Sequence, residues 1–221
     1  MTIRVLLADD HALVRSSFRI LIESEPDLEV VGEAATGHEA VRLARSARAD
    51  VVLMDIWMPG MDGIAATRAL TADQGLTDVR VLMLTTFEAD EYVFQALRAG
   101  ASGFLGKGVG LPDLFHAIRL VADGECLLSP GATKALINRY LATPERPSTG
   151  AAELRSLTTR ERQVLMLVAA GLSNDAIAEQ LRISPSTAKT HANRIMTKLG
   201  VGSRAQLVVI AYQTGYVRPG A

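Results

Sequence analysis

The chain has 221 residues, of which 48% are hydrophobic and 21% charged, a balance typical of globular proteins rather than disordered or collagen-like chains. This length suits one large domain or two small ones. A single cysteine, Cys126, excludes an intrachain disulfide framework and suits a reducing compartment. No apolar stretch reaches membrane-spanning length, and the first predicted strand begins near Ile3, which leaves no room for a signal peptide; we therefore expect a cytoplasmic protein without a membrane partner.

Charge is distributed unevenly along the chain, although its formal net charge is only −1. Residues 1–125 carry 11 Lys/Arg against 19 Asp/Glu, residues 126–153 carry 3 against 2, and residues 154–221 carry 9 against 3. An acidic front half and a basic back half indicate two domains with different partners. We predict a front domain over 1–125 that binds a cation, a linker over 126–153, and a back domain over 154–221 that binds a polyanion.

Strand and helix patterns alternate through the front domain. Short apolar runs predict strands over Ile3–Ala8, Leu28–Ala34, Val51–Met54, Val79–Leu84 and Ala101–Leu105. Apolar residues at helical spacing follow each of these runs. Five strands alternating with five helices, joined by right-handed crossovers, predict an α/β flavodoxin-like sandwich with a five-stranded parallel sheet.

Polar residues stand where these strands end. Asp9 and Asp10 follow the first strand, Asp55 the third, Thr85 the fourth and Lys107 the fifth. Asp55 taken alone is also compatible with a plain turn residue, because Pro59 and Gly60 follow closely. Ligand sites of open α/β sheets collect at the carboxyl ends of the strands, so we expect the five polar side chains to converge there.

Three converging carboxylates predict a site for a hard divalent cation. Oxygen ligands without a cysteine or histidine cluster favour Mg²⁺. The cation would leave Asp55 able to attack phosphorus and form an aspartyl phosphate. Thr85 would donate a hydrogen bond to one phosphoryl oxygen, and Lys107 would neutralise another.

The Asp9-Asp10 pair, the stretch from Asp55 through Met58-Pro59 to Met61-Asp62-Gly63, Thr85 and Lys107 together resemble the receiver domain of bacterial response regulators over residues 3 to about 124. The resemblance implies that Asp55 is the phosphoacceptor and that Asp10 and the backbone carbonyl of Trp57 coordinate Mg²⁺, with Asp9 acting largely through water. It implies that Thr85 and Phe104 form a switch pair, and that Phe104 also packs in the core. Such a domain is not an enzyme beyond its own Mg²⁺-dependent phosphorylation and dephosphorylation.

The sequence departs from the family after the fifth strand. Relatives usually read Leu-Leu-Lys-Asp there, whereas this chain reads Leu105-Gly106-Lys107-Gly108, with Gly110 close behind. Glycines raise the entropic cost of ordering a loop. We expect this loop either to couple phosphorylation to the switch less tightly or to respond to another input.

Four helices are predicted in the back domain. Pro130, Pro144 and Pro147 mark the linker, in which Ala132–Leu141 fits a short helix and Thr143–Ala151 a flexible segment. Thr158 or Thr159, Ser173 and Ser184 are candidate N-caps for the first three helices. A fourth helix over 203–214 carries an apolar stripe wider than one small core needs, which suggests a dimer interface.

The third of these helices has two different faces. Ala188, Ala192, Ile195 and Leu199 form one buried face. The opposite face is polar and basic, and comprises Lys189, Thr190, Asn193, Arg194, Thr197 and Lys198. A solvated helix face explains such a stripe as well, but two short helices joined by a tight turn match helix-turn-helix geometry, and the domain is basic.

The stretch from Leu157 to Gly215 resembles the LuxR-type DNA-binding domain. The matching residues are Leu157-Thr158, Arg160-Glu161, Val164-Leu165, Gly171-Leu172-Ser173-Asn174, Ile177-Ala178, Leu181, Ser184, Thr187, Lys189-Thr190-His191 and Lys198-Leu199-Gly200. The resemblance implies base contacts from Lys189, Thr190 and Asn193 and phosphate contacts from Thr187, His191, Arg194 and Lys198. His191 is also compatible with a buried structural histidine.

With the receiver, the whole chain resembles a response regulator of the NarL/FixJ type. This implies a transcription factor that a sensor histidine kinase phosphorylates on Asp55 and that then dimerises on paired half-sites of double-stranded DNA. We assign Leu207, Val208, Ile210 and Ala211 to the dimer interface.

Two alternatives compete with this interpretation. A phosphohydrolase of the haloacid-dehalogenase kind also uses an Asp nucleophile and Mg²⁺, but it usually has a second acid two residues later, where this chain has Trp57. The second alternative is a binding module that acts without phosphorylation. The five-residue acidic site argues against it, and the glycine-rich loop argues mildly for it.

Overall fold

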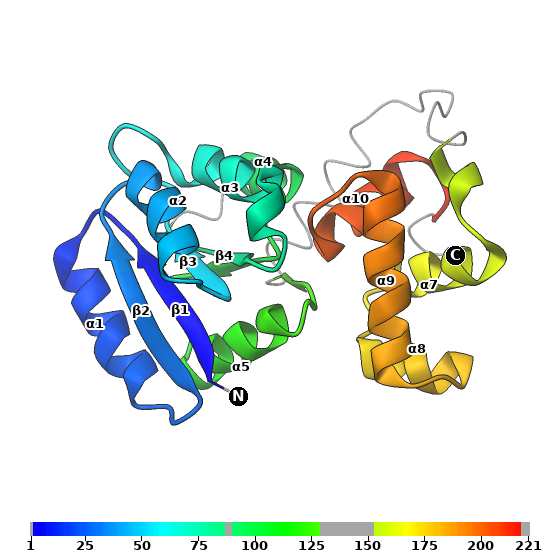
Figure 1. Cartoon of the computed structure of the whole chain (residues 1–221), viewed down its shortest axis with the longest axis horizontal. Helices are drawn as coiled ribbons and strands as arrows, with labels where there is room; N and C mark the ends of the chain where they lie inside the picture. Colours follow the sequence, from blue (N-terminus) through cyan, green and yellow to red (C-terminus); the bar gives the residue numbers. More distant parts are fainter. Residues whose placement is uncertain (1, 87–89, 129–152, 218–221) are drawn as a thin grey trace.

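The structure, a computed structural model, describes residues 2–86, 90–128 and 153–217 (Figure 1). The predicted linker helix over 132–141 and the flexible segment over 143–151 lie outside these residues. Among the helices that are described, none combines the length and the hydrophobicity needed to cross a lipid bilayer.

The front domain alternates strands and helices as predicted. Its strands are β1 (Ile3–Ala8), β2 (Leu28–Ala34), β3 (Val51–Met54), β4 (Arg80–Thr85), β5 (Gly103–Gly106) and β6 (Leu127–Leu128). Its helices are α1 (Ala12–Glu23), α2 (Gly37–Ser46), α3 (Gly63–Ala72), α4 (Asp90–Ala99) and α5 (Leu111–Ala122), with a short 3-10 turn, η1 (Gln74–Leu76).

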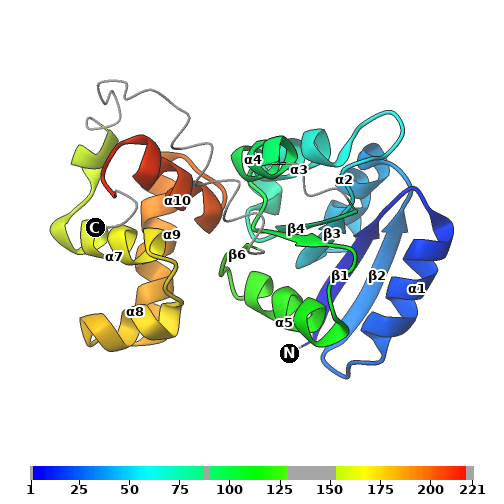
Figure 2. The same cartoon turned by 180° about the vertical axis from the view of Figure 1, so that it is seen from behind.

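The sheet confirms the predicted fold class and adds one strand. All neighbouring strands are parallel, in the order β2-β1-β3-β4-β5-β6. The sixth strand is only two residues long: Leu127 and Leu128 lie in the predicted linker and pair with Gly103 and Phe104 of β5 (Figure 2). So short a strand has no periodicity for sequence analysis to detect.

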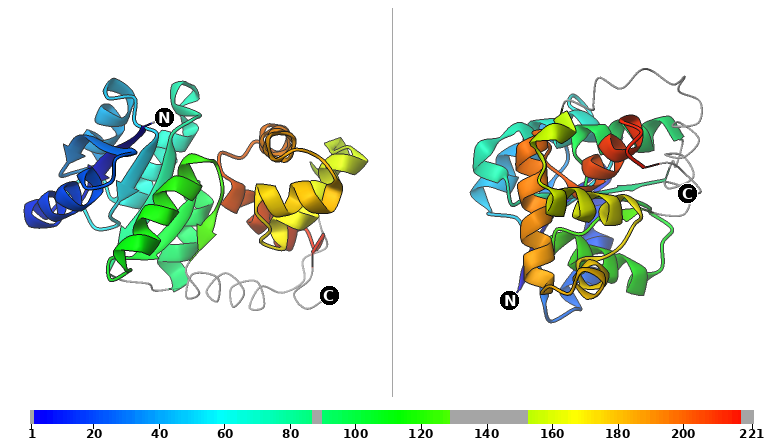
Figure 3. Two further views of the ribbon diagram at one scale, coloured as in Figure 1. Left: turned by 90° about the horizontal axis from the view of Figure 1, so that it is seen from below. Right: turned by 90° about the vertical axis from the view of Figure 1, so that its right-hand side faces the viewer.

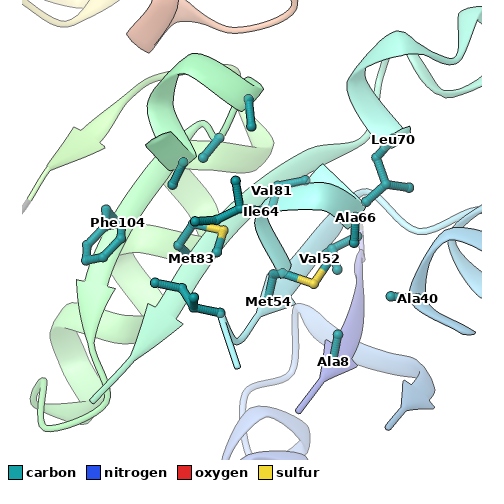
Figure 4. Close-up of a cluster of buried hydrophobic side chains, with 14 of the residues drawn as sticks. Ala8, Ala40, Val52, Met54, Ile64, Ala66, Leu70, Val81, Met83 and Phe104 are labelled. Carbon is teal, nitrogen blue, oxygen red and sulfur yellow. The ribbon is translucent and has the colours of Figure 1, made fainter. Parts of the chain in front are cut away.

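Helices cover both faces of this sheet. On one face, α1 and α5 pack through residues such as Ile22, Leu114 and Ile118. On the other face, α2, α3 and α4 enclose a second cluster of buried residues. Figure 4 shows Met54 and Met83 of this cluster beside Ile64 and Ala66 of α3, with Phe104 on the neighbouring strand. Burial on both faces explains why β3 and β4 are almost continuously apolar.

The back domain is helical. It comprises η3 (Glu153–Ser156), α7 (Thr159–Ala169), α8 (Asn174–Leu181), α9 (Pro185–Leu199) and α10 (Arg204–Gln213). The side chains of Thr158, Ser173, Ser184 and Ser203 cap the four α-helices, and Thr158 and Ser203 each form a complete capping box. The four predicted helices and the caps predicted for the first three are therefore confirmed.

The helical domain lies beside the front domain (Figure 3), and the two domains contact each other through α10 and α4. Ala205 and Val209 of α10 are buried in the same cluster as Val93 and Leu97 of α4. Gln206 Nε2 donates a hydrogen bond to the carbonyl of Arg98 at the end of α4 (2.9 Å). One face of α10 is thus covered by the front domain.

Candidate functional site

Three of the predicted polar residues meet at the carboxyl edge of the sheet. Lys107 Nζ lies 2.6 Å from Asp9 Oδ2 and 2.9 Å from Asp55 Oδ2. Both carboxylates are buried, with 6% of each residue exposed, and 14% of the Lys107 side chain is exposed. Since β1, β3 and β5 are parallel strands of one sheet, residues that are 46 to 98 positions apart become neighbours here.

The electrostatics of this cluster follow from its burial. Burial raises the pKa of Asp55 above its ordinary value, against the opposing effect of the hydrogen bond from Lys107. Burial also acts to lower the pKa of Lys107, but the hydrogen bonds to Asp9 and Asp55 outweigh it and raise that pKa. Lys107 therefore stays charged and supplies the counter-ion for two carboxylates.

The loop after β3 fixes Asp55 from both sides. The backbone N–H of Asp55 donates to the carbonyl of Ala8 (2.8 Å), and Asp55 Oδ1 accepts from the N–H of Ile56 (2.8 Å). Asp62 caps α3, and its side chain accepts a hydrogen bond from the N–H of Ala65. A Cβ on Gly63 would lie 1.9 Å from the carbonyl oxygen of Asp55, so only glycine fits at the start of this helix.

The acidic pair provides a donor set that fits a hard cation. Ligand atoms of Asp9, Asp10 and His11 lie within 4.8 Å of one another. Asp9 is buried, whereas Asp10 is exposed and its Oδ1 lies 2.7 Å from His11 Nδ1. Carboxylate oxygens at the mouth of a partly buried site are the ligands that Mg²⁺ prefers.

The remaining predicted residues surround this cluster. Thr85 and Phe104 are fully buried on the neighbouring strands β4 and β5. An open cavity of about 500 Å³ lies beside Thr85, Gly106, Lys107 and Gly108, with room for a phosphoryl group. Trp57 is 49% exposed, and its ring contacts Tyr92 of α4 edge to face at a centroid distance of 5.3 Å.

The helix-turn-helix is formed by α8 and α9. Arg182 ends α8 in the left-handed conformation (φ 52°), Ser184 caps α9 and Pro185 occupies its first turn. Ala188, Ala192 and Ile195 are buried, whereas Lys189, Thr190, Asn193 and Arg194 are exposed, as the two-faced pattern predicts.

Three other predicted DNA contacts are in different surroundings. Thr187 is half-buried, and its hydroxyl lies 2.8 Å from that of Ser184. His191 is also half-buried, and its Nδ1 is buried without a hydrogen-bond partner among the described residues. Lys198 donates to Glu161 Oε2 (2.7 Å), so it also links α9 to α7.

The residues predicted for a dimer interface divide into two groups. Leu207 and Ala211 are fully buried in the core of the helical domain, because this side of α10 packs on α7. They fill that core rather than an exposed face. Val208 and Ile210 are partly exposed, and Val208 also contacts the front-domain cluster.

The sequence matches two families that together account for this arrangement. Residues 5–119 match the response regulator receiver domain, and residues 155–211 match the bacterial regulatory proteins of the luxR family. The chain belongs to the LuxR-type response regulators. This confirms the predicted family and function: the protein is a two-component transcriptional regulator with a DNA-binding domain, and this family does not consist of classical enzymes.

Relatives of this regulator are similar over nearly their whole length. It is 41% identical over 217 residues to the uncharacterized transcriptional regulatory protein YxjL of Bacillus subtilis, covering 98% of each chain. It is 39% identical over 215 residues to the transcriptional regulatory protein LiaR of Bacillus subtilis, covering 97% of this chain and 99% of LiaR. The response regulator protein VraR of Staphylococcus aureus is 37% identical over 218 residues, covering 99% of this chain and 100% of VraR.

Solved structures of response regulators are also similar to this chain. The response regulator ChrA of a heme-sensing two-component system is 36% identical, with a TM-score of 0.53 over 98% of this chain and 99% of that one. A LuxR-family regulator from Aurantimonas sp. SI85-9A1 is 36% identical, with a TM-score of 0.59 over 64% of this chain and 99% of that one.

Two residues near the regulator's acidic site were missed by sequence analysis. His11 contacts Asp10, and its position directly after the Asp pair was the available signal. Arg15 Nη1 donates to the carbonyl of Asp9 (2.6 Å), and its Nε lies 3.2 Å from Glu33 Oε2 on β2. Arg15 lies one helical turn after the Asp pair, but only the strand order brings Glu33 to it.

Glu161 of the regulator gives a pH-dependent prediction. Although burial acts to raise the pKa of this carboxyl, hydrogen bonds from Lys198 and from Thr158 lower it to about 2, against an ordinary value of 4.5. We expect Glu161→Gln to lower the free energy of unfolding by about 2 kcal/mol at pH 7. A lowered folded-state pKa stabilises above the unfolded pKa, so the difference should shrink as the pH falls from about 4.5 towards 2.

Chemical denaturation followed by circular dichroism across this pH range measures the effect. Glu179→Gln, on an exposed position of α8, is the matched control and should change the stability by less than about 0.5 kcal/mol. A pH-independent loss in Glu161→Gln would contradict the role of the ionised carboxylate.

Proposed function

We propose that Asp55 accepts a phosphoryl group from a sensor histidine kinase and that this modification controls DNA binding by α9. The observation that carries the proposal is the position of Lys107 between Asp9 and Asp55, because it gathers a nucleophile, an acid and a cation at one sheet edge. In the transfer, the bond from phosphorus to the kinase histidine nitrogen breaks, that nitrogen keeps the electron pair, and an Asp55 carboxylate oxygen forms the new bond.

The chain's own residues prepare this step. Asp9, Asp10, Asp55 and the backbone carbonyl of Trp57 would hold Mg²⁺, which supplies positive charge that offsets repulsion between the carboxylate and the phosphoryl oxygens. Thr85 and Lys107 bind phosphoryl oxygens at the ends of β4 and β5. The same Mg²⁺ site would support self-phosphorylation from small phosphodonors and dephosphorylation by water.

Thr85 and Phe104 are proposed as the switch that carries the signal outward. They lie on neighbouring strands, and Phe104 is already fully buried in this structure. Two added negative charges on Asp55 draw the Thr85 hydroxyl towards the phosphoryl group, which changes the packing next to α4. Since α4 also contacts α10, this change in packing acts directly on the helical domain.

DNA recognition is proposed for the exposed face of α9. Lys189, Thr190 and Asn193 reach base edges in the major groove, and Arg194, Thr187, His191 and Lys198 contact phosphates. Lys198 would make its contact while keeping its ion pair with Glu161. A homodimer binds paired half-sites through the partly exposed side of α10, where Val208 and Ile210 lie.

Light scattering after size exclusion tests the receiver part of the proposal. Beryllofluoride, which mimics the phosphoryl group, should double the mass of the wild-type protein in the presence of Mg²⁺, and Asp55→Ala should abolish the shift. Asp78→Ala, an exposed acid on the same domain, is the control and should behave as wild type.

The single tryptophan gives a second readout, because Trp57 lies two residues after Asp55. A fluorescence change without a mass shift would separate loading of the site from dimerisation. Equal responses of wild type and Asp55→Ala in both readouts would overturn Asp55 as the phosphoacceptor.

A further inference from the structure

A short acidic turn that follows α5, Asp123-Gly124-Glu125, lies against the helical domain. Glu125 Oε1 accepts a hydrogen bond from the backbone N–H of Asn174 (2.6 Å), and its Oε2 lies 3.5 Å from Arg204 Nε. Both charged residues are buried, with 9% of Glu125 and 5% of Arg204 exposed. This is therefore an ion pair between domains that is largely removed from water.

The helical domain provides a preorganised binding site for the Glu125 carboxylate. Arg204 Nη1 donates to Asn174 Oδ1 (2.8 Å), and its Nη2 donates to the carbonyl of Leu172 (2.6 Å). These two bonds fix the guanidinium on the start of α8 through contacts within its own domain. Glu125 belongs to the front domain. Its contact with Arg204 therefore forms when the two domains pack together and breaks when they separate.

The same turn also faces the helix that we assign to DNA recognition. Asp123 Oδ1 lies 4.0 Å from Lys189 Nζ, and both side chains are substantially exposed. The Cε of Lys189 lies 3.8 Å from the place of a Cβ on Gly124. The exposed pair adds little energy, but its position shows that the base-reading side of α9 is turned towards the receiver.

We propose that Glu125 is an interdomain latch, which holds α9 against the receiver so that removal of its charge frees the helical domain without phosphorylation of Asp55. The proposal rests on the function proposed above and names its regulation. Once Glu125 is neutral, Arg204 keeps its position in the closed arrangement but loses the opposing charge. The closed arrangement is then penalised, whereas in the open one Arg204 is solvated.

A buried ion pair also explains why such a latch is reversible. Desolvation offsets much of the attraction between the two charges, so the pair fixes one orientation without stabilising it strongly. The remaining contacts of α10 with the front domain come from short side chains, Ala205, Val208 and Val209, and from the hydrogen bond that Gln206 donates. The equilibrium between closed and open forms then lies within reach of a phosphorylation signal.

The test uses the full-length chain in an Asp55→Ala background, so that phosphorylation plays no part. Glu125→Gln, which keeps the side-chain size and removes the charge, is compared with Asp123→Asn, which removes a charge from the same turn. Hydrogen exchange reports opening at α4, α10 and the start of α8. Anisotropy of a labelled mixed-sequence duplex of about 30 base pairs, long enough for two half-sites, reports DNA binding.

We expect Glu125→Gln to exchange about tenfold faster at these segments and to bind the duplex about tenfold more tightly than its parent. Asp123→Asn should differ from the parent by less than about twofold in both measurements. Unchanged exchange in β1 and β3 checks that the receiver stays folded.

Parent-like exchange in Glu125→Gln, or equal effects of the two variants, would overturn the latch. Faster exchange without tighter DNA binding would support the latch and overturn the assignment of α9 to DNA. The two proposals therefore fail in different ways.

Discussion

Charge reversal at Lys189 and Arg194 should weaken binding of double-stranded DNA by at least about a hundredfold at moderate salt. Both side chains are exposed on the same face of α9, so nothing in their own domain screens them from a DNA backbone. Loss of the phosphate contact from Arg194 removes counter-ion release, loss of Lys189 removes a base contact, and each new carboxylate repels the phosphates. The slope of log affinity against log salt should become shallower by about one for the lost phosphate contact of Arg194.

Anisotropy titrations with the beryllofluoride-loaded protein at several salt concentrations measure both quantities. Arg42→Glu/Arg68→Glu makes the same change of net charge on exposed positions of the receiver, and it should lower affinity by less than about threefold. Equal losses in the two double variants would show that the effect is one of overall charge, and α9 would not be the DNA-binding surface.

Lys107→Gln should make the stability of the protein depend strongly on Mg²⁺. Without the ammonium group, the buried carboxylates of Asp9 and Asp55 lose the cation that both of them contact. We expect the free energy of unfolding at pH 7 to fall by about 3 kcal/mol in the absence of Mg²⁺. Mg²⁺ should recover most of this loss and should stabilise the variant more than the wild type.

The pH dependence of this variant has a definite sign. The pKa of Asp55 is already raised by burial, and loss of Lys107 raises it further. A carboxyl whose folded pKa is above its unfolded value destabilises the fold as the pH rises through the folded pKa. The difference between variant and wild type should therefore be largest near neutral pH and should shrink in acid, where the carboxyl is protonated in both.

Denaturant titrations with and without Mg²⁺, followed by Trp57 fluorescence, provide the measurement. Arg42→Gln, an exposed position on α2, serves as the control and should show the Mg²⁺ response of the wild type. A loss of stability in Lys107→Gln that Mg²⁺ does not recover would mean that the acidic edge is no cation site.

Much of the local structure and of the acidic site could be predicted because it depends on signals that are short in sequence. Runs such as Val51–Met54 have the composition of a strand that is buried on both faces. Asp9, Asp55 and Lys107 stand at the ends of such runs, so their place in the sequence alone identifies them as candidate site residues. The caps of α7 to α10 are also local, because a hydroxyl bonds to the N–H two or three residues later.

Contacts between distant segments could not be predicted in this way. Leu207 and Ala211 belong to an apolar stripe on α10, and only packing against α7 decides that they fill a core rather than a surface. Arg15 carries no signal of its own until the strand order places Glu33 beside it. The polar pattern of α9 predicts a phosphate contact for Lys198. It does not show that the fold also pairs Lys198 with Glu161.

The sequence by itself determined the class of each domain, the succession of strands and helices along the chain and the identity of the acidic and basic groups, because periodicity, caps and strand ends are properties of neighbouring residues. Only the tertiary structure decided how the two domains meet. Glu125 and Arg204 are ordinary charged residues in the sequence, 79 positions apart, and no local pattern distinguishes them. Their burial against each other follows from the packing of α10 on α4, which brings the end of α5 to the start of α8.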